Sequence, residues 1–114
     1  MARTSVEAYF HSVSILREPM RAQLFSPALK RDLSGYDARH VFAHHAAQAG
    51  TDDPLALIQY LDLKTYLVGD INTKVDRASM AHSLEVREPL MDHELVEWLV
   101  TLPSHHKIDG GEGK

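Results

Sequence analysis

The apolar residues of this chain recur at intervals of three and four positions, which is the spacing of one face of an α-helix. In residues 54–67, for example, Leu55, Ile58 and Leu61 follow this spacing. No long run alternates apolar and polar residues, so residues 84–86 are the one weak candidate for a strand. The predicted fold class is therefore all-α, with about six or seven helices. The predicted helices cover residues 6–11, 19–25, 28–33, 37–49, 54–67, 70–83 and 93–101.

Residues that start or stop helices mark several of these boundaries. Ser26 and Asp53 each stand directly before a proline, the order expected of an N-cap followed by the first helical turn. Asp92 is expected to cap the last predicted helix. Gly69 is expected to end the helix before it, and Asp70 to cap the next one.

Length and composition narrow the class of protein. The chain has 114 residues, a net charge of −4 and no cysteine, so we expect a single helical fragment over residues 1–114 without disulfides. Its basic residues form no stripe that could neutralise a nucleic-acid backbone. No apolar run approaches the roughly 20 residues of a membrane span. The expectation is a cytoplasmic protein with no nucleic-acid or membrane partner.

The eight histidines raise the alternative of a metal-binding protein. His40 and His44 are four residues apart on a predicted helix, so both rings could reach one metal ion. The glutamate that metalloproteases place between two such histidines is absent. We therefore favour structural or surface histidines and predict no metal site.

The candidate chemistry is concentrated between residues 70 and 93. In a helix over residues 70–81, Asp70, Lys74 and Arg77 fall four and three residues apart and share one face. A carboxylate and an ammonium that face a pocket can hold a metal–phosphate complex, because the carboxylate binds Mg²⁺ and the ammonium offsets phosphate charge. The same spacing suits an exposed, salt-bridged helix, and spacing alone leaves both possibilities open.

A second group of charged residues follows the first. Asp76 and Arg77 point about 100° apart on the predicted helix. Glu85 and Arg87 lie on one side of the chain if the residues around them are extended. We expect these four side chains to form a charge network that fixes the geometry between helix and loop. Such a network would support a pocket rather than react in it.

The stretch from Asp70 to Asp92 reads D-x-x-x-K-x-D-R-x-S-M-x-x-x-x-E-x-R-x-P-x-x-D. This order resembles the signature of the C-terminal synthetase domain of the glutamine-using asparagine synthetases, in particular their bacterial amidotransferase branch. The resemblance extends over a signature region of residues 57–103. A mixed motif of this length is specific, so chance similarity is a poor explanation of it.

The resemblance implies a helical subdomain of an ATP pyrophosphatase-type synthetase domain, with the adenine nucleotide α-hydrolase-like fold. In that family aspartate is activated with ATP and Mg²⁺ as aspartyl-adenylate, and ammonia released from glutamine then attacks it. Asp70 and Lys74 match the acidic and basic positions that approach the Mg²⁺–pyrophosphate or the substrate. Four further matches imply residues that support the pocket wall, namely Asp76, Arg77, Glu85 and Arg87.

The chain departs from the family pattern in ways that bear on activity. It contains neither the Ser-Gly-Gly-x-Asp-Ser pyrophosphate loop nor the nucleophilic cysteine of the glutaminase half. Glu88 and Met91 stand where the family more often has aliphatic residues. We therefore expect the fragment to be inactive alone, to bind no nucleotide tightly, and to expose apolar surface through which it could form a homodimer. The alternative is a stand-alone helical protein-interaction module derived from the same fold.

Overall fold

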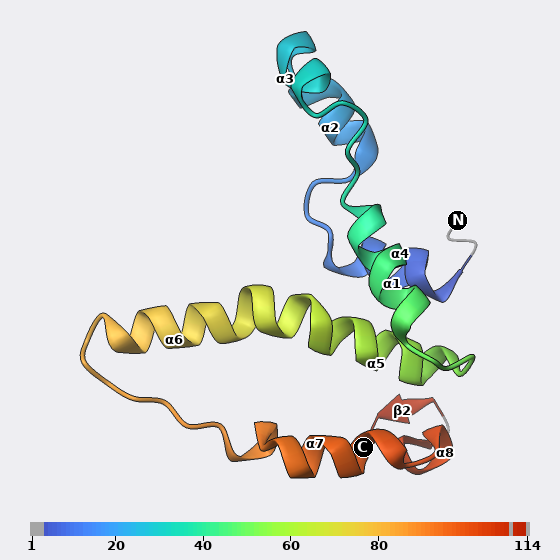
Figure 1. Cartoon of the computed structure of the whole chain (residues 1–114), viewed down its shortest axis with the longest axis vertical. Coiled ribbons are helices and arrows are strands. Elements are labelled where there is room, and N and C mark those ends of the chain that lie inside the picture. Colours follow the sequence, from blue (N-terminus) through green and yellow to red (C-terminus); the bar gives the residue numbers. More distant parts are fainter. Residues whose placement is uncertain (1–3, 110, 114) are drawn as a thin grey trace. The chain divides into compact units, whose positions relative to one another are not determined.

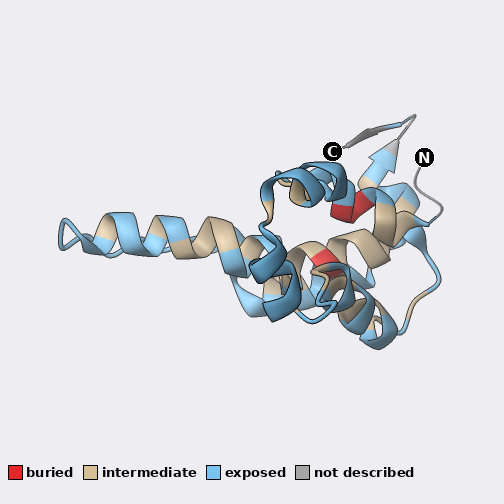
Figure 2. Ribbon diagram, turned by 90° about the horizontal axis from the view of Figure 1, so that it is seen from above, coloured by how far each residue is buried: buried red, intermediate tan, exposed pale blue. Residues whose placement is uncertain are grey.

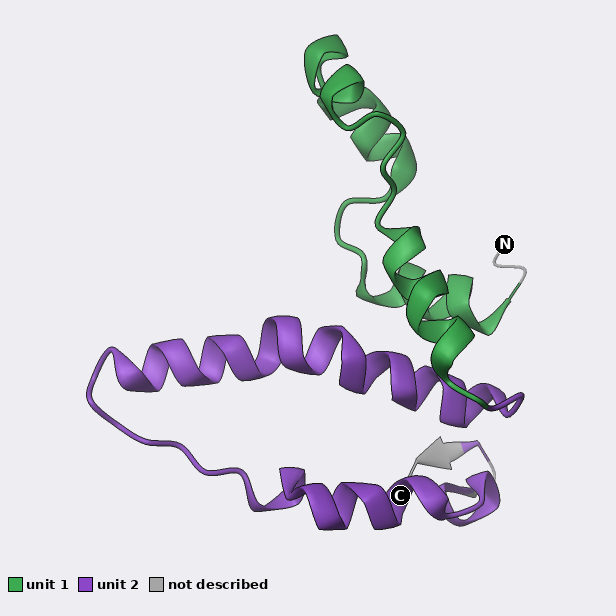
Figure 3. Cartoon of the chain, viewed as in Figure 1, with its two compact units in different colours: residues 1–50 green, residues 51–114 purple. Residues whose placement is uncertain are grey.

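The computed structural model describes residues 4–109 and 111–113 and divides the chain into two compact units, residues 1–50 and residues 51–114 (Figure 3). The single helical fragment predicted from the sequence is thus made of two units, and the signature region lies wholly within the second. None of the described helices is both long enough and apolar enough to cross a membrane.

The described part of the first unit contains four helices, which correspond to the first four predicted (Figure 1). They are α1 (Ser5–Val13), α2 (Glu18–Leu24), α3 (Pro27–Asp32) and α4 (Arg39–Gln48). The start of α3 is as predicted, since the Ser26 hydroxyl accepts a hydrogen bond of 3.2 Å from the Leu29 amide. The chain turns away after α4 at Gly50, whose φ of +62° is a conformation that favours glycine.

Aromatic rings join α1 to α4 within the first unit. Tyr9 and Phe10 on α1 are both buried, each 8% exposed. Phe42 on α4 lies against both of them, with ring centroids 5.1 Å from Phe10 in an edge-to-face arrangement and 5.9 Å from Tyr9. Such ring pairs add a specific attraction to the burial of apolar area, so this cluster stabilises the α1–α4 contact.

Asp37 ties α2 to the beginning of α4 through polar contacts. Its carboxylate accepts hydrogen bonds from the Arg39 amide (2.8 Å) and the Arg39 guanidinium (2.7 Å), and it lies 3.3 Å from the Arg21 guanidinium on α2. Arg39 also lies 3.5 Å from Glu18. The hydrogen bond from the Arg39 side chain holds the pKa of Asp37 well below its usual value, against the opposing effect of burial.

We expect the first unit to lose stability as the pH falls below about 4. The pKa of Asp37 is lower in the folded chain than in the unfolded chain. Its stabilising effect is therefore complete at pH values above the pKa that Asp37 has in the unfolded chain. The effect is lost as the pH falls and the carboxyl becomes protonated. At pH 7, Asp37→Asn should lower the free energy of opening of α4 by about 1 kcal/mol, measured by amide hydrogen exchange. That difference from wild type should shrink in acid.

The matched control for this prediction is Asp32→Asn, which removes an exposed carboxylate from α3. It should leave the exchange of α4 amides unchanged at both pH values. Equal effects of the two substitutions would show that the contacts of Asp37 with Arg21 and Arg39 do not stabilise the unit.

The second unit consists of a long helical run, an extended stretch and a helix that returns beside the run (Figure 1). Its elements are α5 (Pro54–Lys64), the π-helix η1 (Leu67–Asn72), α6 (Thr73–Met80), the 3₁₀-helix η2 (Pro89–Met91), α7 (His93–Thr101), α8 (Ser104–Lys107), β1 (Ile108–Asp109) and β2 (Glu112–Gly113). The strands pair antiparallel, with Ile108 opposite Gly113. The all-α prediction is confirmed: helices lie in all seven predicted ranges, η2 and α8 are additions, and each described strand has two residues.

Both predicted aspartate caps of this unit are formed. The Asp53 carboxylate accepts a hydrogen bond of 2.8 Å from the Ala56 amide at the start of α5. The Asp92 carboxylate accepts bonds from the Glu94 amide (3.0 Å) and the Leu95 amide (3.2 Å) at the start of α7. Each cap satisfies amides that have no partner within their own helix.

Two side-chain hydrogen bonds connect α8 to α5. The Ser104 hydroxyl donates to the Asp53 carboxylate at 2.8 Å, and the Lys107 ammonium donates to the Gln59 side-chain oxygen at 3.0 Å. Because each bond joins residues about fifty positions apart in the sequence, they hold the returning part of the second unit against the first turns of α5.

The predicted helix break at Gly69 is wrong. α5, η1 and α6 follow one another almost without interruption, and the Gly69 amide donates to the Thr65 carbonyl at 2.8 Å. Asp70 therefore lies inside the helical run and caps no helix. A helical glycine costs only about 1 kcal/mol relative to alanine, so the helix-forming residues around it prevail. The wider turn of η1 leaves the Val68 carbonyl to accept a hydrogen bond of 2.9 Å from the Thr73 hydroxyl.

The weak strand candidate at residues 84–86 is also wrong. The end of α6 is a left-handed turn at Ser83, where φ is +57°, closed by a 3.0 Å hydrogen bond from the Leu84 amide to the Ser79 carbonyl. Residues 84–88 then run on without regular structure and pair with no strand of the described chain. A strand needs a neighbouring strand for its backbone hydrogen bonds, and none lies beside this stretch.

Few side chains are buried in either unit (Figure 2). Among the described hydrophobic residues only Tyr9, Phe10 and Leu61 are buried, and Leu61 is completely so. Many large apolar side chains of the second unit are exposed. They include Tyr66, Val68, Met80, Leu84, Val86, Leu90, Trp98, Leu99, Val100 and Ile108. Where such side chains form one contiguous patch, they mark a surface that binds another polypeptide.

Candidate functional site

The predicted site residues all lie in the central part of the second unit. η1 supplies Asp70, α6 supplies Lys74, Asp76 and Arg77, and the extended stretch after α6 supplies Glu85 and Arg87. The helical run therefore presents the first four from one rigid element. The last two stand on a segment without regular structure, so their positions depend on the path of the loop.

Asp70 and Lys74 form an ion pair one helical turn apart. The Lys74 ammonium lies 2.6 Å from the Asp70 carboxylate, and their side chains are 70% and 35% exposed, respectively. The hydrogen bond that Lys74 donates to the Asp70 carboxylate raises the pKa of Lys74 above its usual value. Lys74 is therefore a solvent-facing cation near neutral pH, held in position by its partner.

This pair fits the part of a Mg²⁺–phosphate group that the family resemblance implies. A carboxylate is the kind of oxygen ligand that Mg²⁺ prefers, and an ammonium is a point charge suited to phosphate oxygens. Both groups are open to solvent from the same side of the helix. The structure thus brings these two residues together, as a salt-bridged surface helix would also do. The role that the family resemblance assigns to them stays a prediction.

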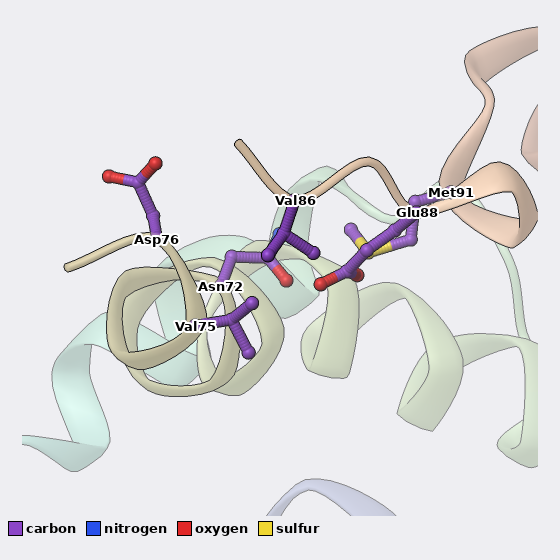
Figure 4. A pocket seen from close by; sticks show the side chains of 6 residues that line it. All are labelled: Asn72, Val75, Asp76, Val86, Glu88 and Met91. Carbon is purple, nitrogen blue, oxygen red and sulfur yellow. The ribbon is translucent and has the colours of Figure 1, made fainter. Parts of the chain in front are cut away.

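A surface pocket lies beside α6 (Figure 4). Lys74 and Arg77 point to one side of α6, whereas Val75 and Asp76 point to the opposite side. The pocket, here called the α6 pocket, has a volume of about 240 Å³ and is lined by Asn72, Val75, Asp76, Val86, Glu88 and Met91. Of the predicted site residues, Asp76 alone lines it.

The predicted charge network between helix and loop is not formed. The Arg87 guanidinium pairs with Glu85 at 2.9 Å, and both side chains are exposed. No ion pair of the described residues joins this pair to Asp76 or Arg77 on α6. An exposed loop with no element packed over it leaves such charges in water, where they pair with their nearest neighbour. The supporting role of these four residues stays a prediction.

The sequence analysis did not identify most of the α6 pocket. Asn72, Val75 and Val86 belong to no charge pattern, so nothing in their spacing marked them. Glu88 and Met91 did carry a signal, because both depart from the aliphatic residues that are commoner in the family at these positions. Both of these residues line the α6 pocket.

The histidines form no recognisable metal centre in the described residues. Within residues 4–109 and 111–113, no three side chains of His, Asp or Glu are grouped so that they could hold a metal ion. Nε2 of His44 lies 3.3 Å from the side-chain nitrogen of Gln48 on the next turn of α4. The assignment of the histidines as structural or surface residues stays a prediction.

Comparison with known proteins gives a consistent set of relatives. The family model described as asparagine synthase matches residues 1–114. A protein of Mycobacterium tuberculosis (strain ATCC 25618 / H37Rv), provisionally named asparagine synthetase (glutamine-hydrolyzing), is 41% identical in an alignment of 92 positions, which covers 76% of this chain and 14% of that protein. Asparagine synthetase (glutamine-hydrolyzing) 1 of Bacillus subtilis (strain 168) is 28% identical over 108 residues, which are 95% of this chain and 16% of that protein. No solved structure matches the chain significantly.

The family match extends beyond the signature region. It includes residues 1–56, where the sequence resemblance was loose, as well as the residues that carry the Asp70–Lys74 pair and the α6 pocket. The chain spans only 14–16% of the length of the two relatives described. The resemblance inferred from the signature is confirmed, and the chain belongs to the asparagine synthase family.

Proposed function

We propose that this chain is a part of an ATP-dependent, glutamine-using amidotransferase that makes asparagine from aspartate. In the proposed reaction an aspartate carboxylate attacks the α-phosphorus of ATP and displaces pyrophosphate, giving aspartyl-adenylate. Ammonia released from glutamine then attacks the activated carbonyl and displaces AMP. The observation that carries the proposal is the Asp70–Lys74 pair, exposed on the signature helix of a chain that matches the family over its whole length.

Lys74 has the main role in this proposal. Its ammonium, which pairs with Asp70, would offset the negative charge that develops on the departing pyrophosphate. Asp70 would hold Lys74 in place and could contribute a carboxylate oxygen to Mg²⁺. Bound with ATP, Mg²⁺ supplies positive charge at the phosphates. Arg77 lies on the same side of α6 and would add positive charge nearby.

We further propose that the chain is inactive by itself. Pyrophosphate needs several donors at once, and backbone amides of a glycine-rich loop are the usual source of them. This sequence has no such loop of the Ser-Gly-Gly-x-Asp-Ser kind, and without cysteine it has no thiol nucleophile for glutamine hydrolysis. One exposed Lys–Asp pair in water binds an anion weakly, so the remaining contacts must come from other parts of the enzyme.

An exchange experiment tests this function. The segment of the mycobacterial relative that aligns with this chain is replaced by the sequence of this chain, and glutamine-dependent asparagine formation is measured. We expect the chimeric enzyme to form asparagine, and the isolated chain, assayed beside it, to form none. A chimeric enzyme that folds but forms no asparagine would contradict the proposal.

A second candidate is a helical protein-interaction module, which would act as a homodimer or with another polypeptide. The observation that favours it is the exposure of large apolar side chains: Trp98 is 58% exposed and Leu90 is 80% exposed. In a synthetase the same side chains would contact the rest of the enzyme. Activity of the chimeric enzyme therefore favours the synthetase role, since an independent module would not replace that segment.

A further inference from the structure

The α6 pocket contains a buried oxygen atom without a hydrogen-bond partner. Oδ1 of Asn72 is buried and has no partner, although buried polar atoms nearly always have one. In Figure 4 the Asn72 amide and the Glu88 carboxylate extend toward the same space, Asn72 from the helical run and Glu88 from the stretch before η2. Two hydrogen-bond acceptors therefore face the pocket from different elements, and the buried one lacks a donor.

The charge of the pocket is negative and is not balanced by its lining. Of the lining residues, Asp76 and Glu88 carry carboxylates, and no lysine or arginine lines the pocket. The cations nearest in sequence do not supply it: Lys74 pairs with Asp70 and Arg87 pairs with Glu85. Arg77 lies on the same side of α6 as Lys74, away from the pocket. A cationic hydrogen-bond donor would balance the negative charge and would also donate a hydrogen bond to the unpaired Asn72 oxygen.

The remaining walls of the pocket are apolar. Val75, Val86 and Met91 complete the lining, and the volume is about 240 Å³. This space accommodates an aliphatic stem of a few carbon atoms together with a planar polar head. Long cationic side chains bind in this way, with the methylene groups on apolar surface and the charge against acceptors.

We propose that the α6 pocket binds a guanidinium group on a short aliphatic stem, carried by a free small molecule or by an arginine side chain of a polypeptide. A guanidinium fits better than an ammonium, because its rigid plane carries five N–H donors and can reach Asn72 and Glu88 at the same time. The inference goes beyond the proposed function, since the pocket lies away from the side of the helix that carries Lys74.

The test uses the 114-residue chain and nuclear magnetic resonance. The side-chain amide signal of Asn72 and the methyl signals of Val86 are followed during titration with n-butylguanidinium, with the peptide acetyl-Gly-Gly-Arg-Gly-Gly-amide, and with the neutral isostere n-butylurea. We expect saturable shifts of both signals with a guanidinium probe, and at least tenfold weaker binding of n-butylurea. Binding of n-butylguanidinium at least as tight as that of the peptide indicates a small molecule, and tighter binding of the peptide indicates a polypeptide.

Two variants distinguish binding in the pocket from a general attraction between the cation and the negatively charged chain. Glu88→Gln should weaken guanidinium binding at least tenfold, because it removes the carboxylate that the cation contacts. Glu94→Gln, an equal change at an exposed position of α7, should leave binding unchanged, and circular dichroism of both variants should match wild type. The proposal is overturned if the probes produce no saturable shifts, if n-butylurea binds equally well, or if both variants bind alike.

Discussion

Lys74→Ala in the chimeric enzyme should lower kcat/KM for asparagine formation by about 100-fold or more. The structure holds this ammonium 2.6 Å from Asp70 on the open side of the signature helix, where the pyrophosphate is proposed to leave. Loss of a positioned charge of this kind is felt in the transition state more than in the bound substrate. The effect should therefore also appear in the exchange of labelled pyrophosphate into ATP, which reports the activation of aspartate alone.

The matched control is Lys64→Ala, which removes an exposed lysine of α5 that lies outside the charged motif. It should leave kcat/KM within about threefold of the parent chimeric enzyme, because exposed charges far from the chemistry contribute little. Asp70→Asn should have an effect between the two, since it frees Lys74 without removing it. If Lys74→Ala keeps full activity, the Asp70–Lys74 pair is a surface salt bridge and nothing more.

Leu61→Ala should produce the largest loss of stability of any single substitution in the second unit, about 2–5 kcal/mol. Leu61 is completely buried, whereas every other described hydrophobic residue of that unit is half-buried or exposed. The substitution removes apolar contacts and leaves a cavity that the surrounding helices fill only in part. With so little other buried surface to compensate, we expect α5 to lose its packing and the chain to unfold well below its normal midpoint.

The measurement is urea unfolding followed by circular dichroism and by the fluorescence of Trp98, the single tryptophan of the chain. Leu90→Ala is the control, because it deletes the same atoms from a side chain that is 80% exposed. It should change the free energy of unfolding by less than about 0.5 kcal/mol. Similar losses for the two variants would show that Leu61 does not anchor this unit.

The exposed apolar side chains and the proposed function support one another. A synthetase segment is expected to keep apolar side chains for contact with the rest of its enzyme, and Trp98 and Leu90 are both more than half exposed. The few buried residues explain why Leu61 has so large an expected effect. A chain with little core of its own gains much of its stability from what binds it.

The helices could be predicted from the sequence because their causes are local. The 3.6-residue spacing of apolar positions and the caps at Ser26, Asp53 and Asp92 act within a few residues, and the structure forms each of them. Gly69 shows where local reasoning failed. A glycine permits a break but does not enforce one, and the continuous run of helical hydrogen bonds through η1 decided the outcome.

The candidate site likewise contains one feature that local spacing predicts and another that depends on the path of a loop. The Asp70–Lys74 pair follows from a spacing of four residues on one helix, so the sequence alone predicted that the two side chains meet. The expected network of Glu85 and Arg87 with the helix needed a particular path of the loop, which the sequence did not specify. The structure instead leaves that pair exposed and brings Glu88 to the pocket beside Asn72.

By itself, then, the sequence determined the all-α class, the helix starts at Ser26, Asp53 and Asp92, and the signature that the family match confirms. The tertiary structure decided which side of α6 forms a pocket and which charges remain in water. The physical reason is the separation along the sequence over which each interaction acts. Helix propensity, capping and ion pairs one turn apart act between near neighbours, whereas the α6 pocket joins Asn72 to Met91 across a loop whose path depends on packing.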